Sequence, residues 1–450
     1  MPAFAGVPNG KSAQIGDIRG SDFPTMSRSP TAFATRMNLI PFLVRCGSQW
    51  RLAARVALAG LLCSTATFAA DWPQWRGPDR NGTTAESGWA GEWKGEPAVA
   101  WKANVGLGHS SIVVSKGKAC TAGHAEEKDT VLCFDAVTGK ELWKHSYPAE
   151  LGDKYYEGGT TGTPTFDGDR LYWLSRWGDV FCFEAGSGKI VWSKNVAQET
   201  GAKIPSWGFT GAPLVHENLL VLNVGEAGLA LDKSTGAIVW KSAANDAGYS
   251  TPLLVERGGA SLALLGSEKS YLAVDLKTGK EAWRFKWLTQ YGVNAADPVV
   301  HGDHVFISSG YGKGAALLKL GAGEPQEVWK SKVLRTQLNP AVLHEGHLYG
   351  VDGDTTQAAA LKCVEFATGT EKWAHPGFGS GGLVIAEGKL IALSQSGELM
   401  IAPASSTEFK PAARAQVLGP KCWTAPVLAN GLVYCRNSRG DVVAVDLRKK

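Results

Sequence analysis

The chain is poor in the features that mark a metal site, a redox motif or a surface for nucleic acid. It has four methionines and nine histidines, and none of its eight cysteines belongs to a Cys-x-x-Cys pair or stands at metal-ligand spacing from a histidine. The formal net charge of +4 comes from residues 1–70, because the rest of the chain carries 39 basic and 40 acidic side chains. The sequence therefore predicts no metal site and no nucleic acid partner.

Residues 1–70 have the pattern of an export leader. Two arginines precede an apolar stretch at 56–69, which is too short for the roughly 20 residues that span a bilayer. We expect a signal peptide cleaved near Ala69 or Ala70, and hence a protein of the periplasm or cell envelope with no membrane span in its mature chain. A retained single-span anchor and a true start at Met37 are the alternatives.

Tryptophan recurs along the chain at a spacing of 42–49 residues. The repeated positions are Trp101, Trp143, Trp192, Trp240, Trp283, Trp329 and Trp373. Periods of this size are typical of propellers and solenoids rather than of separate globular domains. The 55 glycines and 17 tryptophans also favour an all-β fold.

Each repeat has the pattern of four short strands. Two apolar runs flank a Gly- or Asn-containing turn, and a third run alternates apolar and polar residues as a half-buried strand does. Eight such hairpins start near residues 110, 162, 211, 250, 296, 339, 381 and 424. The third strands near 315 and 398 are degenerate copies.

The turn from the third to the fourth strand is the most regular part of the repeat. It reads Asp-Ala-Val-Thr-Gly-Lys-Glu-Leu-Trp at 135–143, and close copies lie at 232–240 and 275–283, with looser ones at 184–192 and 365–373. Asp accepts bonds from backbone N–H groups ahead of it, and Gly supplies a positive φ. The tryptophan then lies on the fourth strand, where we expect it to seal one blade against the next.

The two ends of the repeat region complement each other. The last unit stops at 446–447 after three strands, whereas residues 97–105 form a fourth strand with no unit before it. We therefore predict an all-β, eight-bladed β-propeller of four-stranded antiparallel blades at 97–450, closed by the N-terminal strand completing the C-terminal blade. Residues 71–96 form an N-terminal extension.

These turns resemble the PQQ-like (pyrroloquinoline quinone) repeat, whose hallmark is Asp-x-x-Thr-Gly-Lys-x-x-Trp, and the resemblance covers residues 97–447. The family includes quinoprotein alcohol dehydrogenases and the outer-membrane assembly protein BamB, which has the same ring but no redox chemistry. The opening Asp-Trp-Pro-Gln-Trp-Arg-Gly-Pro-Asp-Arg-Asn-Gly at 71–82 also looks like the start of exported PQQ-repeat proteins of planctomycete-like bacteria. The shared fold leaves the function open.

A quinoprotein dehydrogenase would need bound PQQ, Ca²⁺ and a general base. This chain lacks the adjacent cysteine pair, the large inserted loops and the Cys-x-x-Cys-His haem module of such enzymes. We therefore expect no cofactor, and a non-enzymatic envelope protein that binds a protein or polymer, like BamB. The alternatives are a PQQ- and Ca²⁺-dependent alcohol or sugar dehydrogenase, and a glycan-binding propeller that uses Trp177, Trp207 and Trp423.

Strand alternation places the fourth-to-first and second-to-third connections on one face of the ring, where a site is expected. Aromatics interleaved with charges of both signs suit protein or carbohydrate recognition better than phosphate binding. The residues expected to bind a partner are Tyr155, Tyr156, Trp177, Trp207, Tyr249, Tyr311, Arg335, Trp423 and Arg439. The longest connections, at 144–162 and 195–211, make a partner surface there the sharper hypothesis for a chain that we expect to be monomeric.

Six cysteines follow the leader. An even number in an exported protein permits disulfide bonds. Cys120 and Cys133 lie on neighbouring expected strands on either side of a short polar loop, and they are the candidate pair. Free buried thiols are the alternative.

Overall fold

The computed structural model of the chain describes residues 70–449 except 356–357. They all lie in the second of two units of the chain, Met1–Cys63 and Ser64–Lys450. The expected apolar stretch of the signal peptide, residues 56–69, therefore lies outside the described residues.

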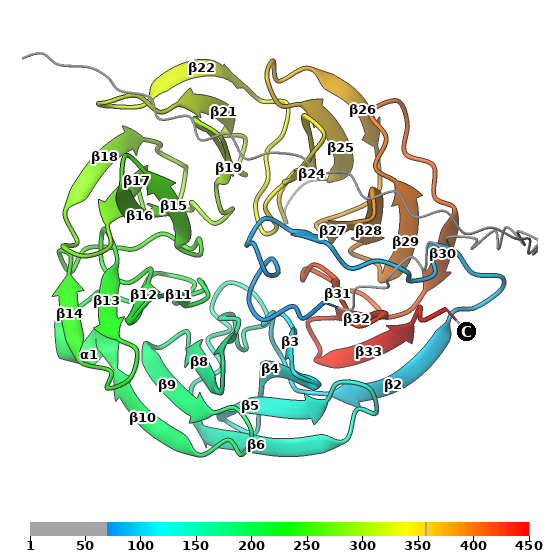
Figure 1. The fold of residues 1–450 in the computed structure, drawn as a ribbon, viewed down its shortest axis with the longest axis horizontal. Helices are drawn as coiled ribbons and strands as arrows, with labels where there is room; N and C mark the ends of the chain where they lie inside the picture. Colours follow the sequence, from blue (N-terminus) through cyan, green and yellow to red (C-terminus); the bar gives the residue numbers. More distant parts are fainter. Residues whose placement is uncertain (1–69, 356–357, 450) are drawn as a thin grey trace, which may run out of the picture. The chain divides into compact units, whose positions relative to one another are not determined.

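Eight antiparallel sheets are arranged around a common axis, with the first strand of each nearest the axis and the fourth at the rim (Figure 1). They are numbered here as blades 1–8 along the chain. One helix, α1 (Val196–Thr200), occurs in the described residues, and it follows the fourth strand of blade 2. No helix in this part of the chain has the length and apolar character to cross a bilayer. The predicted eight-bladed architecture is confirmed.

The strands of the first half follow the repeat in order. Blade 1 has β3 (Val113–Ser115), β4 (Lys118–Ala125), β5 (Lys128–Asp135) and β6 (Glu141–Pro148). Blade 2 has β7 (Thr165–Asp167), β8 (Arg170–Leu174), β9 (Asp179–Glu184) and β10 (Ile190–Asn195). Blade 3 has β11 (Leu214–His216), β12 (Leu219–Leu222), β13 (Leu229–Asp232) and β14 (Ile238–Lys241). Blade 4 has β15 (Leu253–Arg257), β16 (Ala260–Gly266), β17 (Ser270–Asp275) and β18 (Glu281–Lys286).

The second half repeats this order. Blade 5 has β19 (Val299–His301), β20 (His304–Ser309), β21 (Gly314–Lys319) and β22 (Gln326–Ser331). Blade 6 has β23 (Val342–His344), β24 (His347–Asp352), β25 (Ala360–Glu365) and β26 (Glu371–His375). Blade 7 has β27 (Gly382–Ala386), β28 (Lys389–Leu393), β29 (Glu398–Pro403) and β30 (Ala413–Gln416). Blade 8 has β31 (Val427–Ala429), β32 (Leu432–Arg436) and β33 (Asp441–Asp446).

The N-terminal strand closes the ring. β2 (Ala98–Asn104) pairs antiparallel with β33, from Ala98 opposite Asp446 to Asn104 opposite Asp441. Blade 8 is thus built from both ends of the repeat region, as predicted. Closure removes the unpaired strand edge that an open stack would expose.

The recurring tryptophans link neighbouring blades at six of the eight junctions of the described ring. Six of the indoles donate from Nε1 to a main-chain carbonyl in the third-to-fourth-strand turn of the following blade, which confirms their structural role. The pairs are Trp101 with Ala136, Trp143 with Ala185, Trp192 with Lys233, Trp240 with Leu276, Trp329 with Phe366 and Trp373 with Ser405, at 2.7–3.0 Å.

Residues 71–86 cross the centre of the ring, where the dark blue segment lies in Figure 1. The repeat pattern assigns no contacts to this extension, but it contacts residues in or next to blades 1, 5, 6, 7 and 8. Its strand β1 (Thr83–Thr84) adds a parallel fifth strand to blade 7. Its contacts join Trp72 to Val114, Trp75 to Asp297, Arg76 to Ala341, Thr83 to Ile385 and Glu86 to Asn430. We call residues 71–86 the central segment.

Candidate functional site

The connections between blades gather on one face with the second-to-third-strand loops. Leu107, which leads into blade 1, forms a β-bridge with His124 at the end of β4, and Ala247, which leads into blade 4, forms one with Ser267 after β16. Each bridge ties an incoming connection to the loop beside it. The shared face expected from strand alternation is therefore confirmed.

Three aromatic side chains meet on this face, two from its longest connections and the third, Tyr249, from the β14–β15 connection. Tyr155 comes from the β6–β7 connection, which starts only at 149 because β6 extends to Pro148. Its ring centroid lies 5.1 Å from that of Trp207, which lies 5.8 Å from that of Tyr249. We call Tyr155, Trp207 and Tyr249 the aromatic row. Tyr155 is 53% exposed whereas Tyr249 is 8% exposed, so the row is anchored at one end and open at the other.

A buried arginine holds these connections in place. Arg176 is 2% exposed, and its Nη1 donates to the carbonyls of Leu151 and Gly159 at 3.0 Å. Its Nη2 donates to the carbonyl of Trp207 at 3.3 Å, so one side chain fixes both long connections. Its guanidinium also lies 5.4 Å from the ring centroid of Tyr156.

Arg176 was not among the residues expected at the site. The only signal for it in the sequence is a charged residue two positions after an apolar second strand, in Leu-Ser-Arg-Trp-Gly at 174–178. Trp177 beside it is expected to bind a partner, but its Nε1 donates to the carbonyl of Glu150 at 2.8 Å. Trp177 thus helps to hold the β6–β7 connection.

A second aromatic group lies where blades 8 and 1 meet. His109 stacks on Trp423 with ring centroids 5.2 Å apart, and Tyr156 lies 5.7 Å from His109. Burial, and then the charge of Arg436, lower the pKa of His109 to about 3, so this ring is neutral at physiological pH. An ion pair between Lys421 and Glu157, with 2.9 Å between Nζ and Oε2, ties the β6–β7 connection to the loop before blade 8.

Three of the expected residues lie in other surroundings. The N–H of Tyr311 donates to Asp354 at 2.9 Å, and Arg335 forms a two-pronged ion pair with Asp352 at 2.8 and 2.9 Å. Arg439 is exposed, and its carbonyl accepts a bond from the amide of Asn104. The structure therefore brings together Tyr155, Tyr156, Trp177, Trp207, Tyr249 and Trp423, but not Tyr311, Arg335 and Arg439.

The candidate disulfide pair lies in register but is not bonded. Cys120 in β4 and Cys133 in β5 are directly opposite each other, as their positions predict. Both thiols are free and buried in the structure, like those of the other four described cysteines. The expected disulfide bond is thus absent from the structure, and the alternative of free buried thiols describes it.

The described residues offer no cluster of acidic side chains for the Ca²⁺ that would hold a quinone. Such an ion needs several oxygen ligands that converge on one point. Among residues 70–449 apart from 356–357, no group of three or more histidine, cysteine or acidic side chains converges in this way. The buried Asp352 already pairs with Arg335 and with Lys362.

The family model described as outer membrane protein assembly factor BamB matches residues 127–375. No curated protein sequence matches the chain. BamB from Moraxella catarrhalis has a TM-score of 0.59 at 15% identity, over 78% of this chain and 100% of that one. Quinohemoprotein alcohol dehydrogenase from Comamonas testosteroni has a TM-score of 0.65 at 14% identity, over 84% and 81%. A europium-containing methanol dehydrogenase has a TM-score of 0.62 at 12% identity, over 84% and 89%.

Identities this low show a shared fold, and they do not assign the activities of those proteins to this chain. The family model, in contrast, matches more than half of the chain, and the matched part contains the regular turns and their tryptophans. The protein therefore belongs to the BamB family of PQQ-repeat β-propellers.

Proposed function

We propose that this protein is a non-enzymatic scaffold of the cell envelope that binds a protein partner through the aromatic row. The observation that carries the proposal is the exposed ring of Tyr155, which packs on Trp207. Arg176 holds the connection that contains Tyr155 by donating to two of its main-chain carbonyls. An aromatic side chain ordered before binding supplies contact area at a small entropic cost. Aromatic residues also carry much of the binding energy in protein interfaces.

Two further observations support this role. The family is described as an assembly factor, which acts by contact with other proteins. The leader at 1–70 has the pattern of a signal peptide, so we place the mature chain in the periplasm or cell envelope. N-terminal sequencing of the exported form tests this placement, with Ala70 or Asp71 expected as the first residue.

The binding proposal is tested by photo-crosslinking. A benzophenone amino acid at position 155 should give one discrete crosslinked protein in an envelope fraction, identified by mass spectrometry. The Trp207→Ala substitution should reduce this product, because the side chain at position 155 loses the ring that it packs on. A benzophenone at Leu142, an exposed position on the outer strand β6, is the control. Equal products from positions 155 and 142 would contradict the proposal.

A PQQ- and Ca²⁺-dependent dehydrogenase is the alternative that two of the fold neighbours raise. The described residues contain no cluster of acidic side chains for the Ca²⁺, which does not favour this alternative. Titration of the purified protein with PQQ and Ca²⁺ distinguishes the two functions. A saturable quinone absorbance together with dye reduction by an alcohol would replace the scaffold proposal, and we expect neither.

A further inference from the structure

A polar cleft of about 270 Å³ opens between blades 3 and 4, on the same face as the aromatic row. Its lining comes from four connections and from the outer strand β18, so it exists only where two blades meet. The lining residues are Lys203, Glu226, Ala244, Asn245, Asp246, Ser267, Glu268, Lys269 and Arg284. Neither the repeat pattern nor the proposed partner surface accounts for this cleft.

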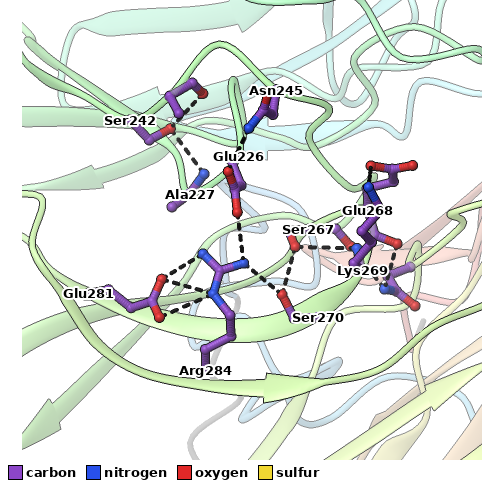
Figure 2. Close-up of polar contacts among 12 residues, drawn as sticks. Glu226, Ala227, Ser242, Asn245, Ser267, Glu268, Lys269, Ser270, Glu281 and Arg284 are labelled. Atoms are coloured by element: carbon purple, nitrogen blue, oxygen red, sulfur yellow. Dashed lines mark hydrogen bonds and ion pairs between the residues drawn. The ribbon is translucent and has the colours of Figure 1, made fainter. Parts of the chain in front are cut away.

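Glu226 lies at the middle of a hydrogen-bond chain in the cleft (Figure 2). Its carboxylate accepts a bond from the amide of Asn245 at 2.8 Å and pairs with Nη1 of Arg284 at 3.1 Å. Arg284 is held in turn by Glu281 at 2.6 Å and by the hydroxyl of Ser270 at 2.9 Å. Planar groups fixed in this way are ordered before any ligand arrives.

The charges that line the cleft balance one another. Three carboxylates face three basic groups, and each is paired: Lys203 with Asp246, Lys269 with Glu268 at 3.1 Å, and Arg284 with Glu226. A charged ligand would have to displace one of these partners. An apolar ligand would desolvate the ions without an apolar wall to pack on. The lining therefore suits a neutral ligand that is rich in hydroxyl groups.

The paired groups keep hydrogen-bonding capacity for such a ligand. A carboxylate has about four acceptor positions, and an ammonium group has three donors. Glu226 uses two acceptor bonds, and the side chains of Lys203 and Lys269 are 67% and 69% exposed. Both donors and acceptors thus line a space of about 270 Å³, which has room for one pyranose ring.

We infer that this cleft binds a single neutral sugar residue, with Glu226, Asn245 and Arg284 as the groups that recognise its hydroxyls. The inference is independent of the proposed function, because none of its residues belongs to the aromatic row. Saturation-transfer NMR of the purified protein with D-glucose, D-galactose, D-mannose and N-acetyl-D-glucosamine tests it. D-Glucuronate and D-glucosamine serve as an anionic and a cationic comparison.

At least one of the four neutral sugars should receive saturation from the wild-type protein, and more strongly than the charged pair. The Glu226→Ala and Asn245→Ala substitutions should each weaken binding roughly tenfold, since each removes a hydrogen bond that involves a charged group. The control is Glu398→Ala, which breaks the Glu398–Arg414 pair at 2.6 Å on blade 7, away from the cleft. Lys269→Ala is a third cleft variant, and it should not disturb folding because the Lys269 side chain is exposed.

Three results would overturn the inference: no transfer to any neutral sugar, a preference for a charged sugar, or transfer that persists unchanged in all the cleft variants. Transfer that persists in the cleft variants but is lost in Trp207→Ala would place the sugar on the aromatic row. If position 155 gives no crosslink but the sugar still binds, the proposed function is contradicted and the sugar site stands.

Discussion

The indole of Trp240 in blade 3 packs so closely on Gly279 in blade 4 that a Cβ atom there would lie 2.6 Å from Cδ2 of the ring. Gly279 also has a φ of +68°, so the turn needs glycine for two separate reasons. The same relationship recurs around the ring, in the pairs Trp101 with Gly139, Trp143 with Gly188, Trp192 with Gly236 and Trp329 with Gly369. The repeat motif thus encodes a contact between blades as well as a turn.

The two reasons can be separated by comparing Gly279→Ala with Gly258→Ala. Gly258 has a φ of +58° in the same blade, with no atom near the position of a Cβ. Both substitutions should cost about 1–2 kcal/mol from the positive φ. Gly279→Ala should cost a further 1–3 kcal/mol or so from overpacking against Trp240. Urea unfolding measures both, and equal losses would show that the ring contact contributes nothing.

The central segment should depend on Asp297. This buried carboxylate accepts bonds from Nε1 of Trp75 and from the N–H of Thr251, both at 2.7 Å. Its charge also acts on the buried Arg76, whose pKa is lowered to about 10, mainly by burial. Asp297→Ala leaves that guanidinium without its counter-charge, so we expect a loss of about 3 kcal/mol in the free energy of unfolding.

The comparison for this prediction is Asp169→Ala, whose carboxylate is 85% exposed beside Arg170. It should change the free energy of unfolding by less than about 1 kcal/mol. If both variants unfold at the wild-type urea concentration, the central segment does not contribute through Asp297.

Arg335 should make stability depend on pH through Asp352. Burial raises the pKa of Asp352, but the bonds from Arg335 and Lys362 lower it more, so its folded value lies below the ordinary one. The unfolded pKa of such a carboxylate is about 4. The stability that it contributes is fully present above this pH and is lost as the pH falls through the folded pKa. Arg335→Ala should therefore cost about 2 kcal/mol at neutral pH, since Lys362 remains as a partner.

Urea unfolding at several pH values checks this prediction. The difference between wild type and Arg335→Ala should shrink once the pH falls below the folded pKa of Asp352. Arg439→Ala, which alters an exposed arginine, should change the pH profile far less, because Arg439 is only the smallest of the causes that lower the pKa of Asp441. A difference for Arg335→Ala that stays constant with pH would mean that its contribution does not pass through the Asp352 carboxylate.

Cys120 and Cys133 should behave as unreactive thiols in the native protein. Burial, and then the neighbouring Cys133 sulfur, raise the pKa of Cys120 well above its usual value, so little thiolate forms at neutral pH. Iodoacetamide should leave both unmodified in the folded protein and modify both in urea without a reductant. Peptide mapping gives the yield at each position, with the buried Cys182 as an internal standard. Modification that requires a reductant would establish the disulfide bond.

The repeat and its closure could be predicted because they rest on local chemistry. The Asp-x-x-Thr-Gly turn bonds to itself, as Asp135 does when its carboxylate accepts from the N–H of Thr138 at 2.8 Å. Among the described residues, the one repeat tryptophan without a bond to the following blade, Trp283, faces a blade that lacks the turn. Blade 5 lacks that turn, and Nε1 of Trp283 in blade 4, which would bond to it, is buried with no hydrogen-bond partner in the described residues.

The sequence by itself determined the eight blades, the tryptophan lock and the strand that closes the ring, since each depends on residues at a fixed spacing. Only the tertiary structure decided that Arg176 holds two connections, that Trp75 reaches Asp297 across the centre, and that Glu226 and Arg284 share a cleft. These contacts join residues whose separation in the chain follows no repeat. These residues come into contact only when the blades close into a ring, and no local sequence pattern specifies which of them meet.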